Sequence, residues 1–192
     1  ALREDEIDLY VVGDIEPEQV EQAANRFFIF PADRKNVKQV SSVQHKKPQN
    51  VKEKIEEQEI NQGKLNIGFR TNITFSNDDY PALQVFNGIF GGFSHSKLFI
   101  NVREKESLAY YASSAIESHI GMLIVMSGID SNNYEKTVSI IKEQLDKMKN
   151  GDFSELEFDQ TKIMLKNSIL ETLDDPRGIV ELLYHQVVAG VT

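Results

Sequence analysis

Residues 88–111 constrain the fold more than any other stretch of the chain. Within this stretch Gly91 and Gly92 predict a tight helix exit, because glycine allows close backbone approach and backbone conformations that other residues avoid. Residues 98–106 are typical of a short charged helix, and residues 108–118 of an aromatic strand. A helix ending in glycine, a second helix and a strand must therefore pack together within one short segment.

Four segments in the main part of the chain are typical of strands. Residues 51–60 and 64–71 alternate apolar and polar side chains around a turn at residues 61–63. Residues 108–118 and 122–130 form a second expected hairpin. The unbroken apolar run of its second arm predicts a central strand that is covered on both faces. The two hairpins predict an antiparallel sheet.

Helical patterns surround these strands. One helix is expected within residues 78–89, and a second carries an apolar stripe over residues 134–148. A capping box formed by Ser154 and Glu157 predicts the start of a third helix. The Asp-Pro pair that begins at Asp175 predicts its end and the start of a last helix. Paired strands followed by runs of helices predict an α+β fold, with helices packed on one face of the antiparallel sheet.

The first part of the chain differs in composition from the rest. Residues 7–12 are typical of a strand, and a helix is expected to follow, with Pro17 in its first turn. We expect residues 1–30 to end a preceding domain and residues 31–48 to form a polar linker. Residues 49–192 are then expected to form the α+β domain, truncated at both ends.

Charge and composition exclude several classes of function. The 192 residues carry a net charge of −9, which argues against nucleic-acid binding because that binding needs a positive field. The longest strongly apolar run, residues 122–126, is far shorter than the roughly 20 residues that span a membrane. The chain has no cysteine, which excludes disulfides and thiolate metal sites. We expect a soluble, cytoplasmic protein.

No motif in the sequence predicts a catalytic or metal site. The two-histidine zinc motifs are absent from the chain, and Glu181 with His185 would leave a zinc ion short of ligands. Ser94, His95 and Ser96 are chain neighbours rather than a base placed opposite a nucleophile. We therefore expect no catalytic residue, no metal ligand and no cofactor within this chain.

Arg103 and Tyr110 leave two interpretations open. Arg103 lies among charged neighbours and could belong to a solvated helix face, while Tyr110 could be an ordinary strand aromatic. Alternatively the two side chains converge, so that the guanidinium donates to a peptide carbonyl and the phenol donates to a substrate or a developing oxyanion. Composition does not decide between these interpretations.

Three groups of residues resemble one known family. Leu-Phe-x-x-Val-Arg-Glu-Lys at residues 98–105, followed by Leu-Ala-Tyr at 108–110, is the most specific group. Residues 10–18, with Val-Val-Gly-Asp before Pro-Glu, and residues 79–92, which end in Gly-Gly, are similar to further family motifs. On these residues the chain resembles the second domain of the zinc metallopeptidases that include insulinase, pitrilysin and mitochondrial processing peptidase, in a bacterial member.

The resemblance implies a function that the residues alone do not. It implies a domain that binds peptide or unfolded polypeptide and helps to form a chamber, with Arg103, Tyr110, Gly91 and Gly92 as substrate-binding residues. Zinc and hydrolysis would then belong to the rest of the parent protein or to a partner, in a homodimer or heterodimer of related subunits. Ser107 replaces the usual glycine of the family, a departure that suits a noncatalytic member. The alternative is therefore a structural partner subunit without hydrolysis of its own.

Overall fold

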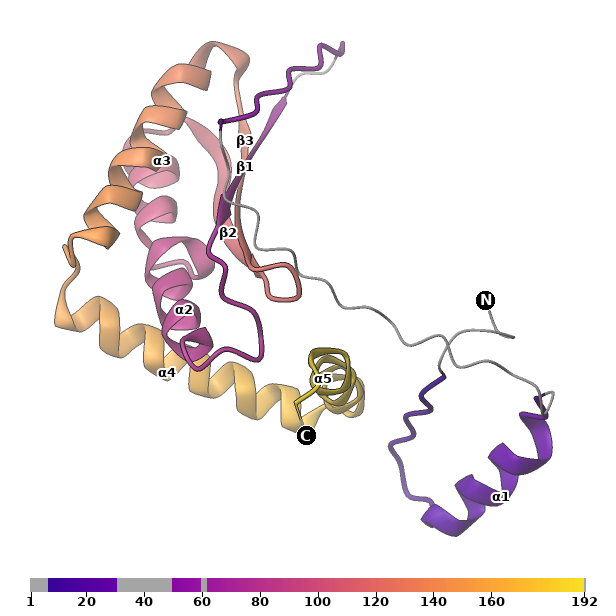
Figure 1. Ribbon diagram of the computed structural model, residues 1–192. Coiled ribbons are helices and arrows are strands. Elements are labelled where there is room, and N and C mark those ends of the chain that lie inside the picture. Colours follow the sequence, from indigo (N-terminus) through magenta and orange to yellow (C-terminus); the bar gives the residue numbers. More distant parts are fainter. Residues whose placement is uncertain (1–6, 31–49, 60–61, 192) are drawn as a thin grey trace. The chain divides into compact units, whose positions relative to one another are not determined.

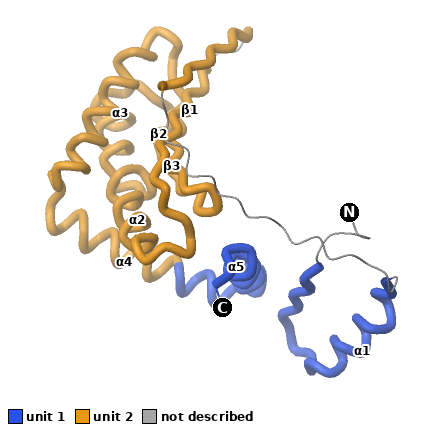
Figure 2. Tube along the Cα trace, in the orientation of Figure 1, with its two compact units in different colours: residues 1–43, 169–192 blue, residues 44–168 orange. Residues whose placement is uncertain are grey.

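The computed structural model describes residues 7–30, 50–59 and 62–191 (Figure 1). These residues belong to two compact units, shown in different colours in Figure 2. One unit comprises residues 44–168 and the other comprises residues 1–43 and 169–192. The expected linker at residues 31–48 lies outside the described residues. The domain boundaries expected from the sequence stay a prediction.

A three-stranded antiparallel sheet forms the centre of the larger unit. Its strands are β1 (Gly63–Arg70), β2 (Ala109–Glu117) and β3 (Met122–Ile129), in the spatial order β1-β3-β2. The hairpin of β2 and β3 turns at Gly121, whose φ of +62° is a conformation that glycine adopts without strain. The sequence predicted this hairpin and the central position of its second strand, and both are confirmed.

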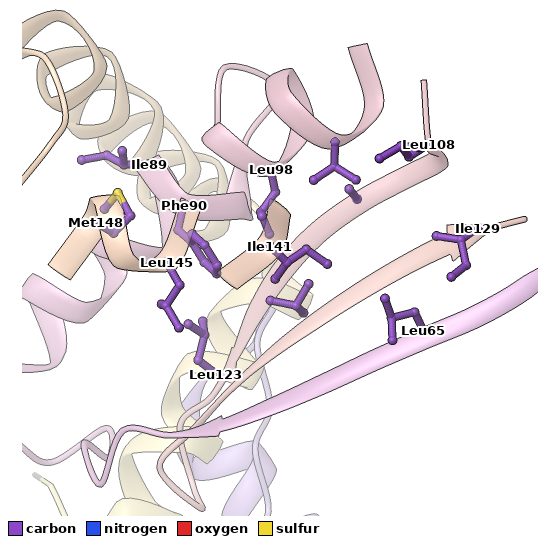
Figure 3. Packing of buried hydrophobic residues seen from close by; sticks show 13 residues of the cluster. Leu65, Ile89, Phe90, Leu98, Leu108, Leu123, Ile129, Ile141, Leu145 and Met148 are labelled. Atoms are coloured by element: carbon purple, nitrogen blue, oxygen red, sulfur yellow. The ribbon is translucent and has the colours of Figure 1, made fainter. Parts of the chain in front are cut away.

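Helices cover one face of this sheet (Figure 1). They are α2 (Tyr80–Asn87), two wider π-helical segments, η1 (Gly88–Gly92) and η2 (Phe99–Lys105), and α3 (Tyr134–Lys149). Between them and the strands lies the apolar core of Figure 3, a single cluster that contains Phe90, Leu98 and Ile141 together with strand residues such as Leu123. The α+β fold with helices on one face is therefore confirmed.

The expectation that the central strand is covered on both faces was wrong. Along β3 burial alternates, with Leu123, Val125 and Ser127 buried and Met122 and Met126 half-exposed. Successive strand residues point to opposite faces, and the described helices of this unit cover only one of them. An apolar run in the sequence cannot distinguish a strand covered on two faces from one whose open face carries methionine and isoleucine.

The helix α4 (Glu155–Asp174) begins where the capping box predicted it. The backbone N–H of Ser154 donates to Glu157 Oε2 at 2.7 Å, and the backbone N–H of Glu157 donates to Ser154 Oγ at 3.2 Å. Phe153 and Phe158 stack beside this turn with their ring centroids 6.4 Å apart. Gly151, at φ +71°, directly follows the end of α3 and begins the connection to α4. Local signals alone account for this helix start.

The smaller unit contains α1 (Pro17–Phe27) and α5 (Pro176–Ala189). Proline occupies the first turn of α1 as expected, because its missing N–H is not needed there. The side chain of Asp175 accepts a hydrogen bond from the backbone N–H of Gly178 at 3.1 Å, which caps α5. The predicted break between the last two helices is confirmed.

Two expected strands do not form. Residues 7–12, and residues 51–59 of the strand expected at 51–60, are described, yet neither segment has strand structure. Residue 60 of that strand and residue 61 of the turn expected at 61–63 lie outside the described residues. A strand persists only where a neighbour shares its ladder of hydrogen bonds. Within the described residues, the sheet contains only β1, β3 and β2, and β1 pairs with β3. Neither of the two expected strands pairs with this sheet, so the local pattern alone gave the wrong prediction.

Candidate functional site

The glycine turn packs on the edge strand of the sheet. A Cβ atom on Gly91 would lie 2.5 Å from Ser114 Oγ and 2.7 Å from its backbone nitrogen, so η1 approaches β2 more closely than any side chain permits. The hydroxyl of Ser114 donates to Asn87 Oδ1 at 2.7 Å, which ties the end of α2 to the same strand. Gly91 is buried here, whereas Gly92 is exposed. Only Gly92 of the two faces solvent.

Two side-chain contacts hold the loop after the glycines against α4. His95 Nε2 lies 2.8 Å from the hydroxyl oxygen of the fully buried Thr161, and Lys97 Nζ lies 3.2 Å from Glu157 Oε1. The Lys97 and Glu157 side chains are only 11% and 25% exposed. His95 also stacks on Phe93, with the ring centroids 5.7 Å apart. His95 thus packs against α4 rather than activating a serine beside it.

Sequence reasoning missed these contacts because they join residues far apart in the chain. Burial acts to raise the pKa of Glu157, but hydrogen bonds from Ser154 and the ammonium of Lys97 outweigh it and hold the pKa below its ordinary value of 4.5. Of these two partners, Ser154 was visible in the capping box, whereas Lys97 was not.

The side-chain amide of Asn101 donates a hydrogen bond to Gln144 Oε1 of α3 at 3.1 Å, so η2 is anchored to α3 as well.

Arg103 is held on the outer side of η2. Its guanidinium carbon lies 4.6 Å from the centroid of the Phe99 ring, a cation–π contact, and its Nε lies 3.7 Å from Glu104 Oε1. The side chain is 42% exposed. Phe99 therefore supports one face of the guanidinium, and an exposed N–H edge remains where an acceptor can approach.

Tyr110 lies in a β-bulge of the edge strand β2. Ala109 pairs with Ile129 and Tyr111 pairs with the next residue of β3, Gly128, so Tyr110 is an extra residue in the ladder. Tyr110 is 67% exposed. Among the described side chains, Arg103 contacts Phe99 and Glu104 rather than Tyr110. They lie on either side of the short connection from η2 to β2, and both are open to solvent.

The donor set does not fit a zinc ion. Among residues 7–30, 50–59 and 62–191, no three histidine, aspartate or glutamate side chains cluster so as to hold a metal. The imidazole of His95 is already in contact with Thr161. Zinc needs three or four such ligands, so no step of a reaction is assigned to a metal in this chain.

None of the helices in the described part of the chain has the length and apolar character needed to cross a membrane.

An antiparallel sheet with helices on one face defines an α+β domain. Arg103 and Tyr110 expose a cation beside its edge strand β2 and a phenol on that strand. The chain belongs to the peptidase M16 family: the family described as the peptidase M16 inactive domain matches residues 2–165. The resemblance stated from the sequence is therefore confirmed.

Individual relatives agree with this assignment. The chain is 53% identical over 191 residues to the probable inactive metalloprotease YmfF of Bacillus subtilis (strain 168), and covers 44% of that protein. It is similar to a conserved protein from Enterococcus faecalis V583, with 47% identity over 67% of this chain and 30% of the other, and a TM-score of 0.64. A protease from Helicobacter pylori shares the fold, with a TM-score of 0.72, 20% identity, and coverage of 92% of this chain and 44% of the other. The chain thus spans less than half of the length of each of these proteins.

Proposed function

We propose that this domain binds extended polypeptide beside β2 and presents it to a zinc site that lies outside these residues. The observation that carries the proposal is the exposure of Arg103 and Tyr110 on either side of the connection into an edge strand. An edge strand offers free backbone groups with which an extended chain can pair regardless of its sequence. Backbone hydrogen bonds would then bind the peptide, and the Arg103 and Tyr110 side chains would fix its orientation.

Each proposed contact has a distinct chemical role. The guanidinium of Arg103, supported by the Phe99 ring, can donate to a peptide carbonyl through its exposed N–H groups. The phenol of Tyr110 can donate to a second carbonyl, or to an oxyanion that develops during hydrolysis. Gly92 is exposed and can offer its backbone to another chain, while Gly91 contributes by letting η1 rest on β2.

The whole protein is proposed to act in a pair. Zinc and the hydrolytic residues would belong to another part of the parent protein or to a related subunit, in a homodimer or heterodimer located in the cytoplasm. A second candidate function is favoured by the name of the YmfF relative, a probable inactive metalloprotease. In that case the chain belongs to a partner subunit that assembles with a peptidase and performs no hydrolysis.

Replacing Tyr110 with phenylalanine tests the proposal. The variant removes one hydroxyl and leaves the ring, so we expect turnover of a fluorogenic peptide by the full-length protein with its related subunit to fall about 100-fold, the effect of one lost oxyanion donor. Tyr184→Phe, which alters an exposed tyrosine of α5, serves as the control and should keep full turnover. Unchanged peptide binding and turnover in Tyr110→Phe would favour the partner subunit instead.

A further inference from the structure

The bulge in β2 places two tyrosines at the surface in succession. In a regular strand Tyr110 and Tyr111 would point to opposite faces, one of them toward the core. Because Tyr110 is the extra residue between the pairs Ala109–Ile129 and Tyr111–Gly128, that alternation is broken, and the two side chains are 67% and 41% exposed. The second tyrosine has no role in the function proposed above.

A buried serine fixes the bulge. Ser127 is fully buried in the central strand, and its hydroxyl donates to the backbone carbonyl of Tyr111 at 2.9 Å. This bond satisfies both a core hydroxyl and a strand carbonyl beside the irregular pair, each of which would be costly to leave unpaired. The position of Tyr111 is therefore set by the core and is not a result of a frayed strand end.

A glycine makes room for the ring of Tyr111. A Cβ atom on Gly128 would lie 2.5 Å from Cε1 and 2.9 Å from Cδ1 of Tyr111, so the ring lies across β3 at this position. Gln62 Nε2 reaches the same point, also 2.5 Å from that Cβ position. Met126, two residues away in β3, shares this open face and is half-exposed. The result is an aromatic and thioether surface beside Tyr110.

We propose that Tyr111 is a second peptide-contacting residue, which selects a large apolar or aromatic side chain in the peptide. This inference rests on the proposed function, because it assumes that peptide binds along β2. The Tyr111 ring lies over Gly128 and is 41% exposed, so it offers aromatic surface to an incoming side chain. Aromatic or aliphatic groups gain most from contact with such a surface. The flexible thioether of Met126 lets the surface adapt to side chains of different shape.

The charge beside this surface offers an alternative that the test must exclude. Lys64 of β1 pairs with Gly128 in the register, so its exposed side chain lies on the same face as Tyr111. Were Lys64 to dominate, the site would favour an acidic side chain. The position of the Tyr111 ring favours an apolar side chain, because Tyr111 and Gln62, rather than Lys64, lie nearest to the Cβ position of Gly128.

Binding of host–guest peptides to the 192-residue chain tests the proposal. Fluorescein-labelled peptides of glycine and serine, with a central Ala, Phe or Asp, are titrated and followed by anisotropy. We expect the Phe peptide to bind about 10-fold more tightly than the Ala peptide, the order of one aromatic contact together with its buried area. Tyr111→Ser should reduce that ratio to about 2-fold, since the ring supplies most of the contact.

Two further variants keep the result interpretable. Gly128→Ala displaces the ring of Tyr111 without removing it, and should lower the Phe-to-Ala ratio in the same way even if Tyr111→Ser weakens the fold. Ile120→Ala, in the exposed turn between β2 and β3, should leave affinity and ratio unchanged. A ratio that survives Tyr111→Ser and Gly128→Ala, or tighter binding of the Asp peptide, overturns the role of Tyr111 alone. No binding of any peptide overturns the proposed function and this inference together.

Discussion

Ser107 is an exposed residue held in the left-handed backbone region, with φ +51°. A side chain in this region costs about 1–3 kcal/mol, whereas glycine adopts it freely. Part of the gain from a glycine is offset by its more flexible unfolded chain. We expect Ser107→Gly to raise the free energy of unfolding by about 1 kcal/mol, which corresponds to a rise in Tm of about 2–4 °C in a scanning calorimeter.

Asn72→Gly is the matched control for this substitution. Asn72 has a similar φ of +58°, but asparagine tolerates that region, so a much smaller gain is expected. An equal gain in both variants, or destabilisation by Ser107→Gly, would show that Ser107 is not strained.

At the scale of the element, the start of α4 predicts a dependence of stability on pH. The pKa of Glu157 is lowered in the folded protein, chiefly by Ser154 and Lys97 acting against burial. A lowered folded pKa means that the carboxylate stabilises the protein above the unfolded value of about 4.5, and that this stability is lost as pH falls through the folded pKa. Glu157→Gln should cost about 1 kcal/mol at pH 7.

Chemical denaturation at several pH values checks this prediction. The loss of stability of the unmodified chain as pH falls below the ordinary glutamate pKa of 4.5 should be smaller in Glu157→Gln, because one linked carboxylate is gone. Glu155→Gln, in the same helical turn but exposed, should follow the unmodified chain throughout. Identical pH profiles for the two variants would refute the assigned role of Glu157.

At the scale of the whole molecule, we expect the purified chain to hydrolyse no peptide. A hydrolytic zinc needs three protein ligands, and the described residues bring no such set together. A quenched-fluorescence assay with added zinc should therefore show no cleavage above buffer, with or without a chelator. Chelator-sensitive cleavage by the pure chain would contradict this expectation, whereas cleavage that appears on adding a related zinc-bearing subunit would support the proposed pair.

The predicted elements differ in how local their signals are. The hairpin of β2 and β3, the helix α3 and the start of α4 rest on turns, periodicity and caps within a few residues, and the structure reproduces them. The expected strands at residues 7–12 and 51–60 rested on the pattern of residues within each segment alone. Pairing of strands is decided by distant segments, so alternation without a partner gave the wrong result.

The candidate site was predictable only in part, for the same reason. Resemblance to the family singled out Arg103 and Tyr110, and the structure shows both exposed beside the edge strand. The bulge at Tyr110, held by Ser127, joins residues in different strands and has no signature in the sequence. The contact of His95 with Thr161 spans 66 positions, beyond the reach of any local pattern.

The sequence by itself determined the family, the α+β class and the positions of the main helices, because motifs and periodicity are properties of neighbouring residues. Only the tertiary structure decided which face of β3 is covered, that Gly91 is packed on β2, and that Tyr111 lies over Gly128. These features depend on contacts between segments distant in the chain. Side-chain volume and hydrogen bonding select such contacts only once the segments have come together.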